Sequence, residues 1–239
     1  MSCGVVLGVV GASGGVGAST MTVALGVVAL RAGLRCVCLD ARPLGGGLDV
    51  VAGLDREPGL RWPQLDRVDG PVPGSDLLAH LPCTAGLPVL SHGREGAGEV
   101  PDAAAEGVLA GLREAVDLCV VDLPGVSHPG WPQWSSRVDT LLLVAGHVLP
   151  ALAAASVVAP MVPAPPGGVW LAQRVGRRAG DLPEVSGRVL DLPVAAGVPD
   201  DAGVARALHR GQPPAGSAGP LRRSCETTLA VLGWTGGQR

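Results

Sequence analysis

The ten residues GASGGVGAST, from Gly11 to Thr20, constrain the fold more than any other part of the 239-residue chain. The apolar run Val5–Val10 precedes them, and a helical pattern begins at about Ala18. Glycine permits positive φ and close backbone approach, and the N-terminus of the following helix offers N–H groups and partial positive charge to an anion. The stretch therefore predicts a phosphate-binding loop between a buried strand and a helix. The loop residues expected at the phosphates are Gly14, Gly15, Val16, Gly17, Ala18, Ser19 and Thr20.

The loop departs from the full P-loop pattern, G-x-x-x-x-G-K-[ST], because Ala18 stands where the lysine belongs. The sequence contains no lysine, so all 18 basic residues are arginine. A hydrogen bond to a charged group contributes about 1.5–3 kcal/mol, so losing the lysine weakens phosphate affinity by roughly 10- to 150-fold. Backbone donors still favour nucleotide binding, but phosphoryl transfer depends more heavily on positive charge. We therefore expect slow turnover or none.

Two carboxylates follow apolar runs elsewhere in the chain. Asp40 follows residues 35–39, and Asp122 follows residues 118–121. Ligands of open α/β sheets bind outside the carboxyl ends of the strands, so we expect both carboxylates and the glycine loop in one crevice. Ser19 stands where a P-loop hydroxyl reaches Mg²⁺, and Asp122 is placed like a Walker B carboxylate. ATP or ADP with Mg²⁺ is the simplest ligand, with Ser19, Asp40 and Asp122 at the metal; each carboxylate alone also fits a solvated strand end.

Arg42 lies two residues beyond Asp40 and has two interpretations. Its guanidinium either lies against phosphate and restores part of the missing positive charge, or pairs at the surface with Asp49 or Asp55. The sequence alone leaves both open, and the surface pair is the simpler one.

Apolar runs alternate with helical patterns along the whole chain, and most of these runs are apolar throughout. Such runs are typical of a parallel sheet covered on both faces. The sequence therefore predicts an α/β fold with a doubly wound, mostly parallel sheet flanked by helices, in one domain over residues 1–239. Strands are expected at residues 5–10, 35–39, 87–90, 118–121, 141–144, 169–172 and 189–192. Helices are expected at residues 18–30, 102–115, 149–158, 201–209 and 221–232, with a short helix or edge segment at 76–81.

Composition disfavours several classes of protein. The six cysteines show no CxxC or metal-finger spacing, which favours buried reduced thiols in a cytoplasmic protein. With a net charge of −3 and no arginine stripe, we expect no specific nucleic-acid partner. Residues 140–173 carry no formal charge apart from a possible one on His147, but five prolines break this stretch into short pieces. A buried strand, a short helix and a loop are expected there instead of a membrane span.

Five segments together resemble the actinobacterial septum-site-determining proteins, CpaE-like members of the MinD/ParA group of deviant Walker A ATPases. They are residues 13–19, 38–49, 59–63, 90–91 and 120–124, and weaker matches follow at residues 198–200 and 210–213. The resemblance implies a MinD-like parallel sheet, a nucleotide-linked homodimer formed face to face, and partners in the division or secretion machinery. It also implies that Gln173, Arg174 and Pro199 lie on the base side of the nucleotide.

The chain departs from that family at three chemical positions. The family has lysines where Ser13 and Ala18 stand, and a carboxylate that positions attacking water where Arg42 stands. Members usually carry an N-terminal receiver-like domain, which we expect to be absent here because the first strand begins almost at once. We therefore expect a weakly catalytic or non-catalytic regulator of division placement. The alternatives are an active ATPase that positions a pilus or secretion apparatus, as CpaE- and TadZ-like proteins do, and a nucleotide-free scaffold.

The C-terminal helical pattern allows two placements. Arg222, Arg223 and the apolar residues after them resemble an amphipathic helix at a membrane surface. The basic residues are few and lie at one end, so docking on the domain's own sheet is expected instead. Membrane contact is then at most peripheral, at the inner face of the membrane.

Overall fold

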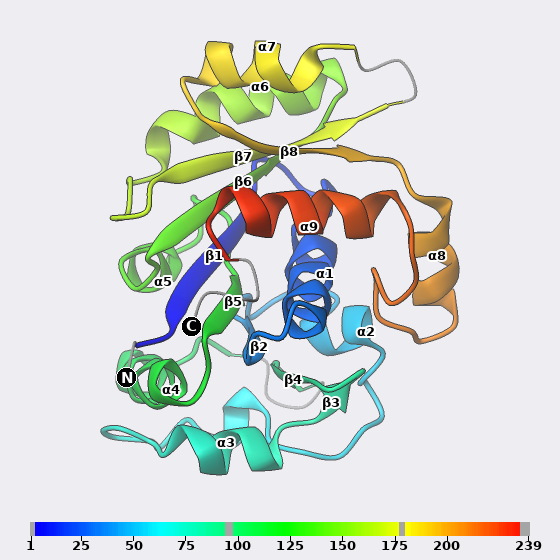
Figure 1. Cartoon of the computed structure of the whole chain (residues 1–239). Coiled ribbons are helices and arrows are strands. Elements are labelled where there is room, and N and C mark those ends of the chain that lie inside the picture. Colours follow the sequence, from blue (N-terminus) through cyan, green and yellow to red (C-terminus); the bar gives the residue numbers. More distant parts are fainter. Residues whose placement is uncertain (1–2, 94–97, 177–179, 235–239) are drawn as a thin grey trace.

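A central sheet organises the computed structural model, which describes residues 3–93, 98–176 and 180–234 (Figure 1). Within these residues the sheet has eight strands in the order β3-β4-β2-β5-β1-β6-β7-β8. All neighbouring strands pair in parallel except β3 and β4, which form an antiparallel edge. The predicted α/β class and mostly parallel sheet are confirmed.

The strands are β1 Val5–Gly11, β2 Cys36–Asp40, β3 Cys83–Thr84, β4 Leu87–Leu90, β5 Leu118–Asp122, β6 Thr140–Ala145, β7 Val169–Val175 and β8 Val194–Pro199. The helices are α1 Ala18–Arg31, α2 Leu48–Ala52, α3 Gly74–His80, α4 Asp102–Ala115, α5 Trp131–Ser135, α6 Leu149–Val158, α7 Leu182–Leu190, α8 Ala202–His209 and α9 Pro220–Val231. Short 3₁₀ helices occupy Trp62–Gln64 and Ala159–Met161.

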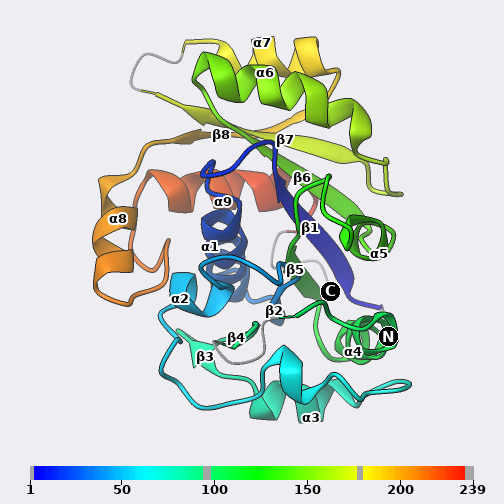
Figure 2. The same ribbon diagram turned by 180° about the vertical axis from the view of Figure 1, so that it is seen from behind.

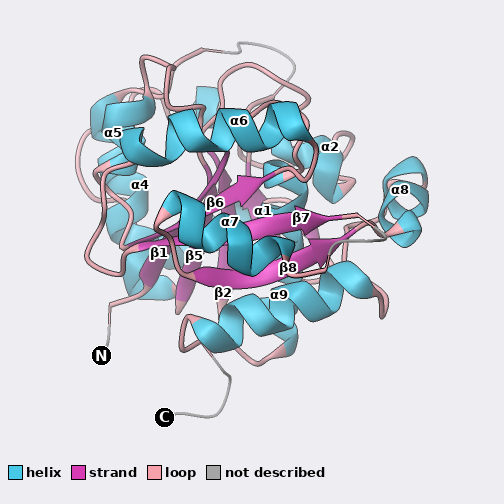
Figure 3. Ribbon diagram, turned by 90° about the horizontal axis from the view of Figure 1, so that it is seen from above, coloured by secondary structure: helices cyan, strands magenta, loops and turns pink. Residues whose placement is uncertain are grey.

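Helices cover both faces of the sheet, as the apolar strands require. α6 and α7 lie on one side of β7 and β8 and α9 lies on the other (Figure 1), and the view from above shows α6 and α9 on opposite sides of the strands (Figure 3). Alternate side chains of β1 enter different cores: Val6 and Val10 join the core beneath α4 and α5, whereas Leu7 and Val9 join the core beneath α1 and α9. The central strands are thereby buried on both faces, which leaves their carboxyl ends as the polar edge.

The phosphate loop leaves the middle of this sheet. β1 lies between β5 and β6, and the loop that follows it leads directly into α1 (Figure 2). A strand, loop, helix and strand therefore follow one another from β1 to β2, as the sequence predicted.

One expected strand is wrong. Residues 189–192 contain the end of α7 and the turn after it, and the last strand is β8. Asp191 adopts a left-handed conformation with φ 53° and ends the helix, and Pro193 follows it. The side chains of Leu190 and Leu192 still pack against the core, so the apolar pattern reports burial but not strand structure.

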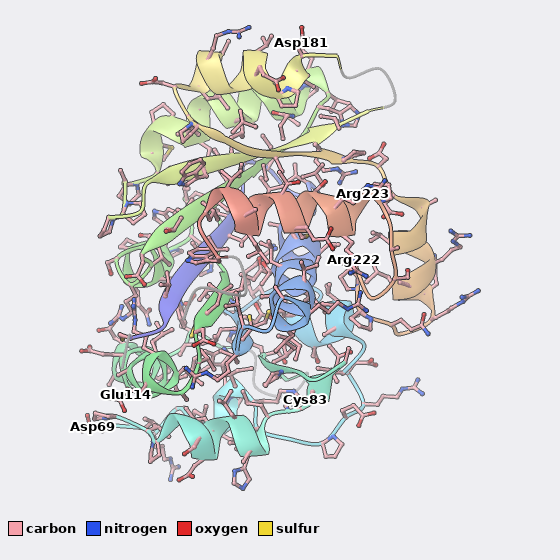
Figure 4. All side chains as sticks on the ribbon, viewed as in Figure 1. Asp69, Cys83, Glu114, Asp181, Arg222 and Arg223 are labelled. Atoms are coloured by element: carbon pink, nitrogen blue, oxygen red, sulfur yellow. The ribbon has the colours of Figure 1, made fainter. Side chains whose placement is uncertain are left out.

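The C-terminal helix docks on the sheet, which confirms the expected placement. Leu221, Cys225 and Leu229 of α9 are buried in the core that it shares with α1 and β8. Arg222 and Arg223 lie at the N-terminal end of α9 (Figure 4), and Arg222 pairs with Glu226 at 2.8 Å. None of the helices in the described ranges has the length and apolar character that crossing a membrane requires.

Four of the six cysteines are buried as predicted, and two are not. Cys36, Cys38, Cys119 and Cys225 are buried as free thiols, but Cys3 and Cys83 are exposed. Cys83 belongs to the edge strand β3 (Figure 4), where the sheet has no further strand to cover it.

Candidate functional site

The loop between β1 and α1 adopts a conformation that needs glycine. Gly15 has φ 75°, and Gly17, which precedes the first turn of α1, has φ 95°. An added Cβ at Gly11 would lie 2.9 Å from Val16 Cγ2, because the loop folds back over the end of β1. The glycine pattern therefore produces a tight loop that ends at a helix N-terminus, the arrangement expected for an anion site.

A cavity of about 480 Å³ lies against this loop. Residues 11–20 form one wall, and Leu123, Val126, Ser127 and Val158 contribute to the others. Its volume is within the range of about 300–1,000 Å³ that small-molecule sites occupy. Of the described residues that line it, Arg42 is the only charged one. The cavity therefore offers a polyanion the N-terminus of a helix and one guanidinium.

The two predicted carboxylates are neighbours in the sheet. Asp40 of β2 and Asp122 of β5 are register partners, and each is about 1% exposed. The oxygens of Asp40 accept hydrogen bonds from the backbone N–H groups of Arg42, at 3.0 Å, and Leu48, at 2.8 Å. Asp40 thus anchors both ends of the glycine-rich segment 42–48. In the part of the chain that the structure describes, Asp122 Oδ1 has no hydrogen-bond partner.

Burial shapes the protonation of both groups. Desolvation raises the pKa of Asp40 to about 6, against the opposing effect of its two backbone hydrogen bonds. Desolvation and the nearby charge of Asp40 raise the pKa of Asp122 to about 7, while Ser19 and Arg42 oppose that rise. A cation close to Asp122 therefore favours the ionised form of this buried carboxylate.

Arg42 supplies that cation. Its Nη1 lies 3.1 Å from Ser19 Oγ and 3.9 Å from Asp122 Oδ2. The side chain remains 41% exposed, and it lines the phosphate cavity. Arg42 therefore forms its ion pair with Asp122 at the end of β5. Asp55, one of the surface partners considered for Arg42, pairs with Arg56 at 3.9 Å instead.

The same contacts decide whether Mg²⁺ fits. A serine hydroxyl and a carboxylate are suitable oxygen donors, but Mg²⁺ requires near-octahedral ligands at about 2.0–2.1 Å. Arg42 Nη1 already lies within 4 Å of both oxygens, 3.1 Å from Ser19 Oγ and 3.9 Å from Asp122 Oδ2, so a dication bound by them would meet a positive charge at close range. Within the described ranges, no group of three or more His, Cys, Asp or Glu side chains could hold a metal ion. With Arg42 in this position, the predicted metal residues Ser19, Asp40 and Asp122 do not fit Mg²⁺.

The residues predicted on the base side separate into two groups. Arg174 and Pro199 line a second cavity of about 230 Å³ that adjoins Gly17 and Thr20. Arg174 also donates to the Val16 carbonyl at 3.3 Å and pairs with Asp200.

Gln173 lies behind this cavity instead of lining it. It is fully buried, and its Nε2 donates to the backbone carbonyls of Ala145, Gly146 and Arg174. Its described contacts support the end of β6.

Several lining residues were not predicted from the sequence. Val126, Ser127 and Val158 reach the phosphate cavity, and Val204 and Leu208 of α8 reach the second one. The turn Leu123–Pro124–Gly125 after β5 was a usable signal for Val126 and Ser127, because it places the following residues at the carboxyl edge. The face that α8 presents depends on tertiary packing and had no such signal.

The architecture is shared with solved structures of positioning ATPases. A ParA family ATPase from Chlorobium tepidum superposes with a TM-score of 0.76, at 16% identity, over 97% of this chain and 99% of that one. MinD in the MinC:MinD complex of Aquifex aeolicus gives a TM-score of 0.77 at 17% identity, over 96% of each chain. The fold is that of the MinD/ParA P-loop NTPases. The cell division ATPase MinD of Pyrococcus furiosus agrees, with a TM-score of 0.74 at 19% identity, over 95% of this chain and 99% of that one.

Sequence comparison adds similarity to two curated proteins, from two strains of Mycobacterium tuberculosis. The uncharacterized proteins MT3760 and Rv3660c are each 35% identical to this chain over 190 residues, which is 77% of this chain and 53% of theirs. The chain therefore spans about half of the length of these relatives. No protein-family model matches the sequence.

Proposed function

We propose that this chain binds the phosphates of ATP or ADP at residues 11–20 and serves as a nucleotide-binding regulator that places cell-division machinery. The observation that carries the proposal is the cavity at the N-terminus of α1, which the glycine loop lines and into which Arg42 brings the positive charge. Backbone donors and a guanidinium suit a polyphosphate, whatever the rest of the nucleotide contributes.

The relatives in fold support this assignment. One is described as the septum site-determining protein MinD of Pyrococcus horikoshii complexed with Mg-ADP, and its TM-score is 0.68 at 17% identity. Another is a putative plasmid partition protein of Borrelia burgdorferi bound to AMPPNP, with a TM-score of 0.66 at 12% identity. The MinC:MinD complex of Aquifex aeolicus provides the precedent for a protein partner. A nucleotide-linked homodimer and a division or secretion partner, met in the cytoplasm or at the inner face of the membrane, belong to the same proposal.

Turnover is proposed to be slow or absent. Ser13 and Ala18 supply no positive charge, and Arg42 stands where a carboxylate would position water. Arg42 replaces part of the missing charge at the loop, but it brings no group that orients a nucleophile. The chain is therefore expected to bind nucleotide and to hydrolyse it slowly or not at all.

Calorimetric titration with ATP and with ADP tests the proposal, with phosphate release measured on the same samples. The unmodified chain is expected to bind at up to millimolar concentration and to release little phosphate. Gly17→Ala should weaken binding at least about tenfold, because Gly17 has φ 95° beside the cavity. Gly33→Ala is the matched control. Gly33 has φ 86° just after α1, and an added Cβ there would meet no atom within 4 Å, so the alanine variant has the same backbone strain outside the site.

The other outcomes select the alternatives. Hydrolysis that disappears in Asp122→Ala would favour an active ATPase that positions a pilus or secretion apparatus. If neither nucleotide binds at millimolar concentration, the chain is a scaffold and the proposal is wrong.

A further inference from the structure

Arg42 contacts both of the side chains that a P-loop protein would use for its metal. Its Nη1 lies 3.1 Å from Ser19 Oγ and 3.9 Å from Asp122 Oδ2. The two contacts join the segment after β2 to the first turn of α1 and to the end of β5, so three separate parts of the chain meet at one guanidinium. The contact to Ser19 spans 23 residues of sequence and arises only from the tertiary fold.

The surroundings hold the guanidinium there. Asp40 Oδ1 accepts a hydrogen bond from the backbone N–H of Arg42 at 3.0 Å, which fixes the start of the side chain. Both oxygens of Asp40 already accept backbone N–H groups of the segment 42–48. Asp122 is about 1% exposed, and its Oδ1 lacks a partner among the described residues, so it is the carboxylate that needs a neighbouring cation.

Arg42 lines two cavities. One is the phosphate cavity of about 480 Å³. The other, which it lines with Ser19, Asp40 and Asp122, has a volume of only about 20 Å³. A space of that size holds roughly one water molecule and not a hydrated dication.

We propose that Arg42 takes the place of the divalent cation, so that the loop binds a metal-free nucleoside di- or triphosphate. The inference rests on the proposed nucleotide binding and specifies the form of ligand that the site accepts. A guanidinium carries five N–H donors, and Nη1 is the atom engaged with Ser19 and Asp122. The side chain is 41% exposed at the cavity, which leaves donors available for paired contacts with phosphate oxygens.

This arrangement reverses the usual effect of Mg²⁺ on affinity. In a metal-dependent site the ion bridges protein and phosphate, so chelating it weakens binding. Here Mg²⁺ bound to the phosphates would neutralise part of the negative charge to which Arg42 is attracted. It would also place a second cation beside the guanidinium. Affinity is therefore expected to be equal or higher when the metal is chelated.

Calorimetric titration of ATP into the full chain, in EDTA and in excess Mg²⁺, tests the inference. The unmodified chain should bind at least as tightly in EDTA as in Mg²⁺. Arg42→Ala should lose at least about tenfold in EDTA and regain affinity when Mg²⁺ is added. Arg42→Lys keeps a cation and should remain independent of metal. Arg56→Ala, at an arginine whose side chain is 95% exposed, is the matched control and should behave like the unmodified chain.

Electron paramagnetic resonance of Mn²⁺ gives a readout that does not depend on ATP affinity. With ADP present, the unmodified chain should leave the Mn²⁺ spectrum as it is with ADP alone, and Arg42→Ala should add a protein-bound signal. Circular dichroism verifies that the variants are folded.

Each result decides the matter. Binding of ATP by the unmodified chain only when Mg²⁺ is present overturns the inference and leaves the proposed function standing. Metal-free binding that Arg42→Ala does not weaken also overturns it, because another group must then carry the charge. Absence of binding in both buffers overturns the proposed function, and the inference with it.

Discussion

Asp40 acts mainly through the backbone of its neighbours. Its carboxylate accepts the N–H groups of Arg42 and Leu48, and its carbonyl accepts the indole N–H of Trp62 at 2.7 Å. His92, at the end of β4, packs beside Trp62 with ring centroids 6.5 Å apart. These contacts form a buried support behind the phosphate site, and they include a histidine that is only 6% exposed.

His92 makes the stability of this support sensitive to acid. Desolvation lowers its pKa to about 4, below the ordinary value of 6.5 for histidine. The unfolded chain therefore binds the proton first, and the stability that neutral His92 contributes is present above pH about 6.5 and lost as the pH falls toward 4. We expect His92→Gln to lose less stability than the unmodified chain between pH 7.5 and 4.5, by up to about 3 kcal/mol.

Urea denaturation at the two pH values measures this difference. Asp40 and Asp122, whose pKa values are raised, have the opposite sign: they gain stability as the pH falls through their titration. Both carboxylates are present in both proteins, so their effect cancels in the comparison. Equal losses in the two proteins on acidification would show that His92 does not titrate differently on unfolding.

At the scale of single residues, the sequence predicted which side chains lie close together but not which atoms each of them contacts. Strand ends in a parallel sheet determine that Asp40, Asp122 and the loop converge, and they do. The direction of the Arg42 side chain depends on the hydrogen bond from its backbone N–H to Asp40 and on the burial of Asp122. Neither produces a pattern in the sequence. The contacts of Gln173 could not be predicted for the same reason, since its neighbours along β7 do not reveal which carbonyls it reaches.

Among the elements, α4 and the segment before α3 make an unusually close contact through glycine. An added Cβ at Gly111 would lie 1.7 Å from the carbonyl oxygen of Val72, and one at Gly107 would lie 2.1 Å from that of Gly70. These obstacles are backbone atoms, so no side-chain rotation relieves them. The two glycines therefore set how closely residues 70–74 pack on the helix.

Gly111→Ala should consequently destabilise the protein, although alanine favours helix by about 1 kcal/mol over glycine. Overpacking against backbone is expected to cost about 1–3 kcal/mol or more, while nucleotide affinity of the folded variant should stay unchanged because α4 does not line either nucleotide cavity. Chemical denaturation measures the loss. Ala110→Gly, at the exposed neighbour, is the control and should cost only about 1 kcal/mol. A Gly111→Ala protein more stable than the unmodified chain would contradict the close contact.

Long elements were predictable from the sequence, whereas several of the shortest were not. The helix over residues 102–115 was expected with the bounds of α4, because its alanines and leucines repeat at helical spacing over several turns. The two-residue strand β3 spans one strand period and the five-residue helix α2 little more than one helical turn, so neither is long enough to repeat a pattern. At α7 the run Val189-Leu190-Asp191-Leu192 suggested a strand because three of its four residues are apolar, whereas the left-handed Asp191 divides it between a helix and a turn.

The whole molecule joins its two cores through the strands that they share. Val6 of β1 and Cys119 of β5 belong to the core under α4, while Leu7 and Val120 of the same strands belong to the core under α1 and α9. Because adjacent residues of one strand enter opposite cores, neither core can come apart without disturbing the other. This coupling favours a single cooperative unit over the described residues.

The cysteines provide a built-in test of that cooperativity. Cys119 lies in the first core and Cys36, Cys38 and Cys225 lie in the second, all of them buried, whereas Cys3 and Cys83 are exposed. A thiol-reactive reagent, applied as a short pulse at increasing urea concentration and followed by peptide mass spectrometry, should label Cys3 and Cys83 without urea. The four buried thiols should become reactive together, at the midpoint given by circular dichroism. If Cys225 reacts well before Cys119, α9 and its core open as a separate unit, and nucleotide binding at α1 would then depend on a local equilibrium instead of on the stability of the whole fold.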